Sequence, residues 1–223
     1  MSRRSSRMTR GAADGASAPP RDHQVVGRLV VLFVLMNIPT IEMERLRLRA
    51  FEVGDLQPYA EMYADDLFVR YLSGARLTKE QTWENMALIL GHWSLLGYGI
   101  WAIERLGTGE LVGRAGLLNL PGWPDVEVCW ALSPKFWGNG YATEAVKASI
   151  NWAFREAGIR RLISLIHPEN QRSEAVALRL GERFLEQITF EAKLTNVYEI
   201  LNSVGALQAL NLREFKKHQI PPA

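Results

Sequence analysis

The residues best suited to chemistry lie in one loop, residues 135–145, with the sequence KFWGNGYATEA. Gly138 and Gly140 stand two positions apart, after a predicted strand at 126–132 and directly before a predicted helix. Glycines at this place allow successive backbone N–H groups to turn toward one point, with the positive end of the helix dipole behind them. Such a loop suits a phosphate or pyrophosphate, although the pattern also fits an ordinary tight turn between a strand and a helix.

Spacing excludes two common phosphate-binding loops. A P-loop requires Gly-Lys-Ser/Thr, whereas Tyr141, Ala142 and Thr143 follow Gly140 here. A dinucleotide fingerprint needs a third glycine at position 143, which is a threonine. An anion bound at this loop would therefore be held by another type of site.

The elements that position the loop alternate between strand and helix patterns. Strands are predicted at 44–51, 100–104, 111–120, 126–132, 162–167, 184–191 and 193–201, and helices at 55–64, 79–96, 140–157 and 173–180. This order predicts an α/β (α+β) protein with a mixed, mostly antiparallel central sheet flanked by helices. One parallel step, from 126–132 to 162–167, is expected as a right-handed crossover.

Composition is typical of a folded globular domain. The chain has 223 residues, of which 48% are hydrophobic and 22% are charged. Its one cysteine, Cys129, excludes an internal disulfide framework, and its four histidines have no ligand spacing, so we expect no metal. Six arginines and two aspartates fall in residues 1–40, which leaves the rest slightly acidic and gives no sign of nucleic-acid binding.

The two ends of the chain differ from the region between them. Residues 1–42 are predicted to be a disordered or extension segment, with a short apolar run, LVVLFVLM, at 29–36. This run is shorter than the roughly 20 residues of a bilayer-spanning helix; a targeting or membrane-touching role and an added strand or helix are the alternatives. Residues 43–201 are predicted to be the working domain, and residues 202–223 a tail with at most a short helix.

Several motifs resemble one known family. The stretch WGNGYATEA follows VEVCWALSP and precedes Asn170 and Ser173 in the pattern N-x-x-S. With ERLRLR from residue 44 and ALRLG up to residue 181, they resemble the GNAT superfamily of acetyl-CoA-dependent N-acetyltransferases. The match is closest to the branch of ribosomal-protein N-terminal alanine and serine acetyltransferases. It covers roughly residues 43–201 and implies a GNAT-like fold.

The resemblance implies acetyl-CoA as co-substrate, held largely by backbone groups. The family's signature falls on Lys135-x-x-Gly138-x-Gly140, with Lys135 in place of the usual Arg or Gln. The backbone of Ala131 and Leu132 would hold the acetyl and pantetheine portions. Loop N–H groups would hold the pyrophosphate, namely those of Phe136, Trp137, Gly138, Asn139, Gly140, Tyr141, Ala142 and Thr143.

Direct acetyl transfer to an amine requires that the amine first lose a proton. Glu127, acting through a water molecule, is the candidate base. Strand alternation places it on one face with Cys129 and Ala131. The alternative is a structural Glu127 that pairs with an arginine or is solvated.

The departing CoA thiolate would benefit from a hydroxyl donor. Ser173 is the candidate, with Tyr141 and Tyr198 as alternatives, and it could equally be an ordinary cap of the following helix. The amide of Asn170 could hold pantetheine or position Ser173.

The predicted function is therefore an acetyl-CoA-dependent N-acetyltransferase acting on a protein N-terminus or a small-molecule amine. The alternative is a non-catalytic module that binds or senses acyl-CoA. We expect a cytoplasmic monomer or homodimer without a nucleic-acid partner or membrane attachment. Residues 181–184 (GERF) depart from the family's common Gly-Phe continuation, which predicts a difference on the substrate side.

Overall fold

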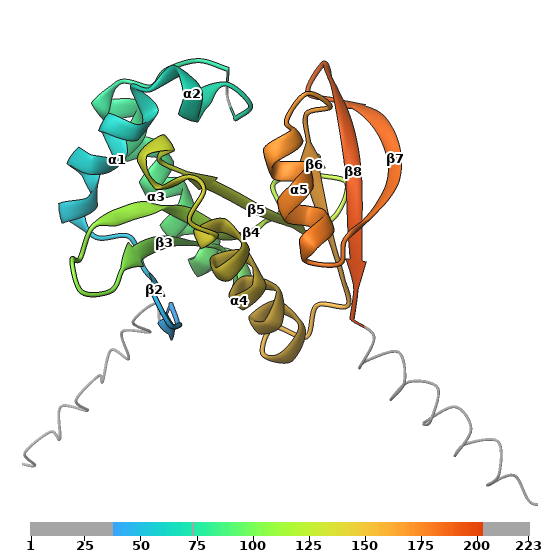
Figure 1. Cartoon of the computed structure of the whole chain (residues 1–223), viewed down its shortest axis with the longest axis horizontal. Coiled ribbons are helices and arrows are strands. Elements are labelled where there is room, and N and C mark those ends of the chain that lie inside the picture. The colour runs from blue at the N-terminus through green and yellow to red at the C-terminus, as the bar shows by residue number, and fades with distance from the viewer. Residues whose placement is uncertain (1–37, 73, 203–223) are drawn as a thin grey trace, which may run out of the picture. The chain divides into compact units, whose positions relative to one another are not determined.

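An eight-stranded sheet runs through the centre of the protein in the order β1-β2-β3-β4-β5-β6-β8-β7. The computed structural model describes residues 38–72 and 74–202. The strands are β1 (Ile41–Glu42), β2 (Leu46–Arg49), β3 (Ile100–Arg105), β4 (Leu111–Leu118), β5 (Glu127–Leu132), β6 (Arg161–Ile166), β7 (Arg183–Phe190) and β8 (Lys193–Leu201). Neighbouring strands are antiparallel except β5 and β6, which are parallel. The predicted mixed, mostly antiparallel sheet is confirmed (Figure 1).

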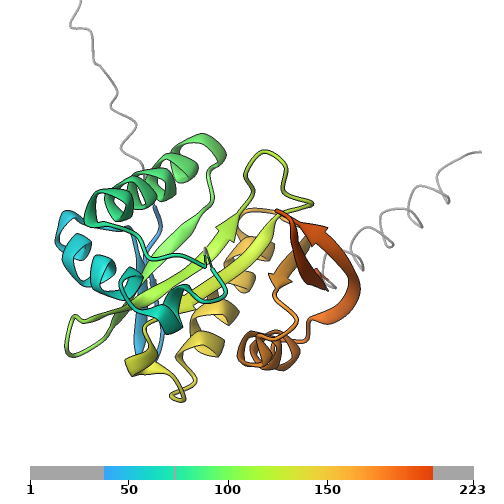
Figure 2. The same ribbon diagram turned by 90° about the horizontal axis from the view of Figure 1, so that it is seen from above.

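Helices cover both faces of this sheet. The helices are α1 (Leu56–Tyr63), α2 (Asp66–Val69), α3 (Lys79–Leu96), α4 (Tyr141–Arg155) and α5 (Gln171–Arg179). Figure 2 shows α1 and α3 on one face and α4 and α5 on the other. Two short 3-10 helices, η1 (Val53–Asp55) and η2 (Pro134–Phe136), precede α1 and the loop at 138–140. Within the described residues, no helix combines the length and apolarity that crossing a membrane requires.

Local sequence explains why several elements form where they do. Leu46 and Leu48 are fully buried and alternate with arginines, as expected for a half-buried strand. Thr78 caps α3 in a capping box with Gln81, and Gly97 ends the helix in the left-handed conformation at φ 73°. The alternation in β2 and the caps of α3 each depend on residues close together in the sequence. The sequence therefore predicts both elements at nearly the correct positions.

The core joins the two helical layers to the sheet. Trp101 of β3 is completely buried and packs edge to face against Trp93 of α3 and Trp152 of α4, with ring centroids 4.7 and 5.1 Å apart. The Trp101 indole donates to the carbonyl of Pro39 at 2.7 Å. Residues near 39 are therefore anchored to the centre of the domain.

The structure adds elements that the sequence pattern does not reveal. Strand β1 pairs with β2, so the boundary predicted at residue 43 falls within the first hairpin. Strand β1 has two residues and α2 has four, which is too short for a periodic pattern. The predictions for residues 1–37 and 203–223, including the apolar run at 29–36, lie outside the described residues. The division into extension, domain and tail stays a prediction.

Candidate active site

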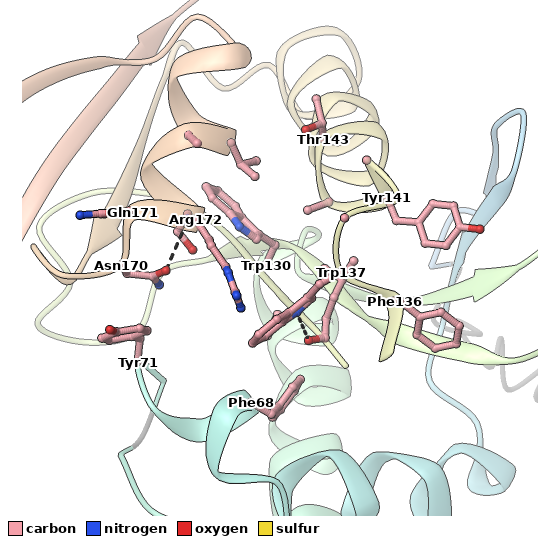
Figure 3. Close-up of a pocket in the computed structure, with 18 of the residues that line it drawn as sticks. Phe68, Tyr71, Trp130, Phe136, Trp137, Tyr141, Thr143, Asn170, Gln171 and Arg172 are labelled. Atoms are coloured by element: carbon pink, nitrogen blue, oxygen red, sulfur yellow. Dashed lines mark hydrogen bonds between the residues drawn. The ribbon is translucent and has the colours of Figure 1, made fainter. Parts of the chain in front are cut away.

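A cavity of about 1320 Å³ opens at the carboxyl end of β5. The first turns of α4 and α5 form one side of it, and α2 with the chain that follows forms the other (Figure 3). The sequence-predicted residues that line it are Ala131, Leu132, Phe136, Trp137, Gly138, Gly140, Tyr141, Ala142, Thr143, Asn170 and Ser173. The folded chain thus brings together residues from two loops about 30 positions apart.

Strands β5 and β6 diverge beside this cavity. Their only backbone register pair is Glu127 with Ile163, at the start of β5. Farther along, the Val128 carbonyl accepts from the side-chain hydroxyl of Ser164 at 3.1 Å. Backbone direction alternates along β5, so Trp130 faces β6 like Val126 and Val128, whereas the Ala131 carbonyl lies against Gly113 of β4. The β6-facing backbone of Trp130, which lines the cavity, is therefore available to a ligand.

The glycine loop owes its shape to backbone conformation. Gly138 and Gly140 have φ values of 80° and 77°, in the left-handed region that favours glycine. Gly140 is the N-cap of α4 and has no side chain to satisfy the first-turn amides of Tyr141, Ala142 and Thr143. A Cβ at residue 138 would meet no protein atom within 4 Å, so the loop faces open space. This is the geometry of an anion-binding helix N-terminus.

Arg45 of the β1–β2 turn fastens the loop to the sheet. Its guanidinium contacts the Glu144 carboxylate at 2.6 Å and donates to the Asn139 carbonyl at 2.9 Å. It also lies 4.9 Å from the centre of the Tyr141 ring. Glu144 sits in the first turn of α4, where it would repel an anion, and Arg45 offsets this charge. Sequence analysis missed Arg45, because its partners are 94 and 99 positions away.

Two aromatic contacts shape the floor of the cavity. The Trp137 indole donates to the Leu132 carbonyl at 2.9 Å, so this carbonyl has a protein partner. The Arg172 guanidinium stacks over the Trp137 ring, 4.3 Å from its centre (Figure 3). Neither carbonyl assigned to the acetyl and pantetheine portions is free on the β6 side, because the Ala131 carbonyl lies against Gly113 of β4 and the Leu132 carbonyl accepts from Trp137. Trp130, which the sequence analysis did not single out, also lines the cavity.

Lys135 and Asn139 do not line the cavity. The Lys135 ammonium points to Glu110, 3.5 Å away, and lies 4.6 Å from the centre of the Phe136 ring. The Asn139 side chain turns inward to donate to the carbonyls of Phe136 and Trp137 at 3.0 and 3.2 Å. These side chains support the loop from behind, because their partners lie on the protein side.

The first turn of α5 presents Asn170 and Ser173 to the cavity. Asn170 is the N-cap, and its Oδ1 accepts from the Ser173 backbone N–H at 3.2 Å (Figure 3). The capping role considered for Ser173 therefore belongs to Asn170. Across the cavity, the Tyr71 hydroxyl donates to the Glu169 carbonyl at 3.4 Å, and the Tyr71 ring lies 5.2 Å from that of His167.

Positive charge predominates around the cavity. Two carboxylates line it, those of Glu144 and Glu169, and Glu144 is paired with Arg45. The cationic side chains that line it are Arg45, Arg70, Lys147, Arg172 and Arg179. A polyanionic ligand is therefore favoured over a cationic one.

Glu127 lies outside this cavity, at the start of β5. Its Oε2 accepts from the Trp123 indole at 2.8 Å. Burial raises the pKa of Glu127 to about 7, and the indole donor and the charge of Arg114 offset part of the effect. A carboxyl group with such a pKa can accept and release a proton near neutral pH.

Other candidate groups are accounted for by structural contacts. The Tyr198 hydroxyl, an alternative thiolate donor, does not line the cavity and instead donates to Glu174 at 2.7 Å. Burial raises the pKa of the Cys129 thiol far above its usual range. Among the described residues, no cluster of three or more His, Cys, Asp or Glu could hold a metal ion.

Comparison with known proteins identifies the family. A model of the acetyltransferase (GNAT) domain matches residues 45–183. The Bacillus subtilis protein YkkB is 31% identical over 172 residues, which cover 74% of this chain and 97% of YkkB. YoaA of the same organism, named an N-acetyltransferase, is 26% identical over 171 residues, covering 73% and 97% of the two chains.

Solved structures agree with this match. An acetyltransferase from Agrobacterium tumefaciens is 30% identical with a TM-score of 0.66, covering 74% of this chain and 95% of its own. RimL, a ribosomal L7/L12 α-N-protein acetyltransferase in complex with coenzyme A, has a TM-score of 0.64 over 73% and 98% of the chains. At 18% identity, RimL shows the shared fold alone. The family match over most of the domain, the relatives and the fold agree: the chain belongs to the GNAT family and is an N-acetyltransferase.

Proposed function

We propose that this N-acetyltransferase binds acetyl-CoA in the cavity at the carboxyl end of β5 and passes the acetyl group directly to an amine. The observation that carries the proposal is the convergence of two helix N-termini and the loop at 138–140 on one cationic cavity. Its volume of about 1320 Å³ exceeds the roughly 300–1,000 Å³ of most small-molecule pockets, which suits a ligand as long as CoA.

The donors available fit the chemical groups of CoA. Backbone amides of the first turn of α4 are suited to the pyrophosphate, as the family resemblance implies. The unpaired edge of β5 at Trp130 is suited to the amide groups of the pantetheine arm, and Asn170, whose Oδ1 is engaged, retains its Nδ2 as a donor there. When bound, acetyl-CoA supplies an activated acetyl group as a thioester.

Glu127 is proposed as the base that removes a proton from the attacking ammonium, through a water molecule. Its pKa of about 7 leaves a substantial carboxylate fraction at neutral pH. The Trp123 indole donates to Oε2 and the Leu165 backbone N–H is a second donor to this carboxyl group, so water would bind at the remaining acceptor positions. The freed amine then attacks the thioester carbonyl, the C–N bond forms and the C–S bond breaks.

Ser173 is proposed to supply the hydroxyl that donates a hydrogen bond or a proton to the departing thiolate. It stands in the first turn of α5 facing the cavity, and its hydroxyl makes no hydrogen bond to another described residue. The dipole of α5 stabilises negative charge at the same place. Asn170 fixes this turn through the Ser173 amide and is proposed as a positioning residue.

The test is a thiol-release assay with acetyl-CoA and a panel of N-terminal peptides and small amines. We expect Ser173→Ala or Glu127→Gln to lower kcat at least tenfold, while CoA affinity and thermal stability are retained. Thr189→Ala and Glu186→Gln, exposed changes on β7, are the matched controls. CoA binding without acceptor-dependent thiol release by the unaltered enzyme would indicate a sensing module and contradict the proposal. Equal kcat in both site variants and the controls would remove the roles proposed for these side chains.

The acceptor class, the cytoplasmic location and the choice between monomer and homodimer stay predictions from the sequence.

A further inference from the structure

Arg114 is an inward-facing cation without an ion-pair or hydrogen-bond partner among the described residues. It lies on β4 in the middle of the sheet and is only partly exposed. Every other strand arginine in β2 to β4 is ion-paired with a carboxylate, whereas the Arg114 guanidinium makes no ion pair or hydrogen bond with any described residue. Withdrawing a guanidinium from water without a compensating partner is costly. An unpaired cation here therefore points to a ligand.

The position of Arg114 is directly beside the proposed reaction site. It is the register partner of Ala131 on β5, so both side chains leave the sheet on the same face. Alternation along β5 places Cys129 and Glu127 on that face as well. The charge of Arg114 reaches both, because it lowers the pKa of the Cys129 thiol and of Glu127 against the larger effect of burial.

Between Arg114 and Glu127 the sheet carries only small side chains. Cys129 stands opposite Gly116, and Ala131 stands opposite Arg114 itself. Glu127, Cys129 and Arg114 all retain partial exposure, although they lie on central strands. Among the described side chains, the only inaccessible oxygen or nitrogen atoms without a hydrogen bond belong to Glu182, so solvent reaches the guanidinium nitrogens of Arg114. The sheet surface formed by Cys129 and Ala131, between Glu127 and Arg114, therefore carries small side chains and is open to solvent.

A second donor lies on the helices above this sheet surface. Asn85 of α3 accepts at Oδ1 from the hydroxyls of Tyr59 and Tyr63, at 2.9 and 3.4 Å. This leaves its Nδ2 without an acceptor among the described residues. Both tyrosines lie near Arg114, whose charge is the largest effect that lowers the pKa of Tyr59 against burial. The Arg114 guanidinium and the Nδ2 of Asn85 can only donate hydrogen bonds. Both lie in the region of Tyr59 and Tyr63, so an acceptor group is favoured there.

We infer that Arg114 binds a carboxylate of the acceptor, and that the acceptor is a small amine whose carboxylate lies close to its amino group, as in an amino acid. The inference rests on the proposed function. The guanidinium offers a planar pair of donors that matches a carboxylate. With the carboxylate on Arg114, the amino group lies over the sheet surface of Cys129 and Ala131, between the cation and Glu127. A protein N-terminus, whose nearest carbonyl is an amide, lacks this group.

The experiment compares the L-amino acids with their C-terminal amides and with short peptides in the thiol-release assay. For the unaltered enzyme we expect kcat/KM for a free amino acid to exceed that for its amide by roughly 10- to 100-fold, as for a charge-assisted hydrogen bond. Without recognition by the enzyme, the amide would be the more reactive acceptor. Removing the carboxylate charge lowers the pKa of the amine, so more of it is unprotonated at neutral pH. A peptide amide with an acidic side chain tests whether a side-chain carboxylate can replace the α-carboxylate of a free amino acid.

Variants separate recognition from a structural role. Arg114→Gln should abolish the preference for acid over amide while CoA affinity is unchanged, and Arg114→Lys should retain part of it. Arg47→Gln, a partly exposed change on β2, is the matched control. If Arg114→Gln does not fold, the comparison of free amino acids with their amides in the unaltered enzyme still tests whether the acceptor must carry a carboxylate.

Each outcome has a defined meaning. A preference for amides or peptides over free amino acids overturns the inference and leaves the proposed function intact. Equal losses on acids and amides in Arg114→Gln overturn it as well, since they would show that Arg114 acts only through Glu127. Absence of thiol release with every acceptor, despite CoA binding, refutes the proposed function and the inference with it.

Discussion

Glu182 yields the sharpest quantitative prediction, because it is a carboxylic acid in the interior. It is 2% exposed, and neither carboxylate oxygen has a hydrogen-bond partner among the described residues. It follows Gly181, beyond the end of α5, at the position where the sequence departs from the Gly-Phe continuation of the family that it resembles. Burial raises the pKa of Glu182 from its ordinary 4.5 to about 7, with a smaller opposing effect of the nearby Ser164 hydroxyl.

The sign of the resulting pH dependence follows from proton binding. Between pH 4.5 and 7 the folded chain holds a proton on Glu182 that the unfolded chain has lost, so the free energy of unfolding falls as pH rises through this window. A difference of one in pKa corresponds to about 1.4 kcal/mol, so ionised Glu182 destabilises the fold by about 3 kcal/mol at pH 8. For a domain of this size that is roughly 6–12 °C in Tm.

The assay is thermal unfolding at pH 5 and pH 8 for the unaltered protein, Glu182→Gln and Glu182→Met. For each protein we compare the Tm at pH 5 with the Tm at pH 8. We expect this decrease in Tm to be roughly 10 °C smaller in Glu182→Gln and Glu182→Met than in the unaltered protein. Glu186→Gln, on the exposed side of β7, should behave like the unaltered protein. A parallel loss of Tm in all four proteins would refute the reasoning, because it would mean that Glu182 ionises without penalty.

Three further predictions concern the proposed CoA site and base. Gly140→Val should weaken CoA binding at least tenfold, as measured by calorimetry, because a side chain is strained at φ 77°. Gly122→Val, a control at φ 94° in a turn outside the loop at 138–140, should leave CoA affinity unchanged. Arg45→Gln should raise the KM for acetyl-CoA several-fold by freeing the charge of Glu144, and Arg47→Gln should not; steady-state kinetics distinguishes them. The kcat of the unaltered enzyme should rise with pH around a midpoint of about 7, as carboxylate forms on Glu127, and an activity independent of pH between 6 and 8 would contradict that assignment.

Much of the fold could be predicted because its signals are local. The capping box at Thr78, the left-handed Gly97 and the hairpin of β7 and β8 each depend on residues close in sequence. The parallel step from β5 to β6 followed from one helix between two strands, and it is confirmed. Strand β1 and helix α2 were missed, since two and four residues carry no detectable period.

The candidate site could be predicted only in part, for the same reason. The loop at 138–140 was predicted from its glycine spacing and the turn at 170–173 from its N-x-x-S pattern. The helix cap, considered for Ser173, proved to be Asn170. The sequence does not reveal the direction of the Lys135 side chain, which pairs with Glu110 of the neighbouring hairpin and does not line the cavity. No local pattern connects Lys135 of η2 with Glu110 of the β3–β4 turn, 25 positions away in the sequence.

The sequence by itself determined the order of the elements, the anion-binding loop and the family, because each depends on short-range spacing. Only the tertiary structure decided which charges are paired. Arg45 and Glu144 lie 99 positions apart and neutralise each other, whereas Arg114 on an inner strand forms no ion pair with a carboxylate of the described residues. Whether a buried charge has a partner depends on which strands the sheet sets side by side, and that register is fixed by the packing of the whole core.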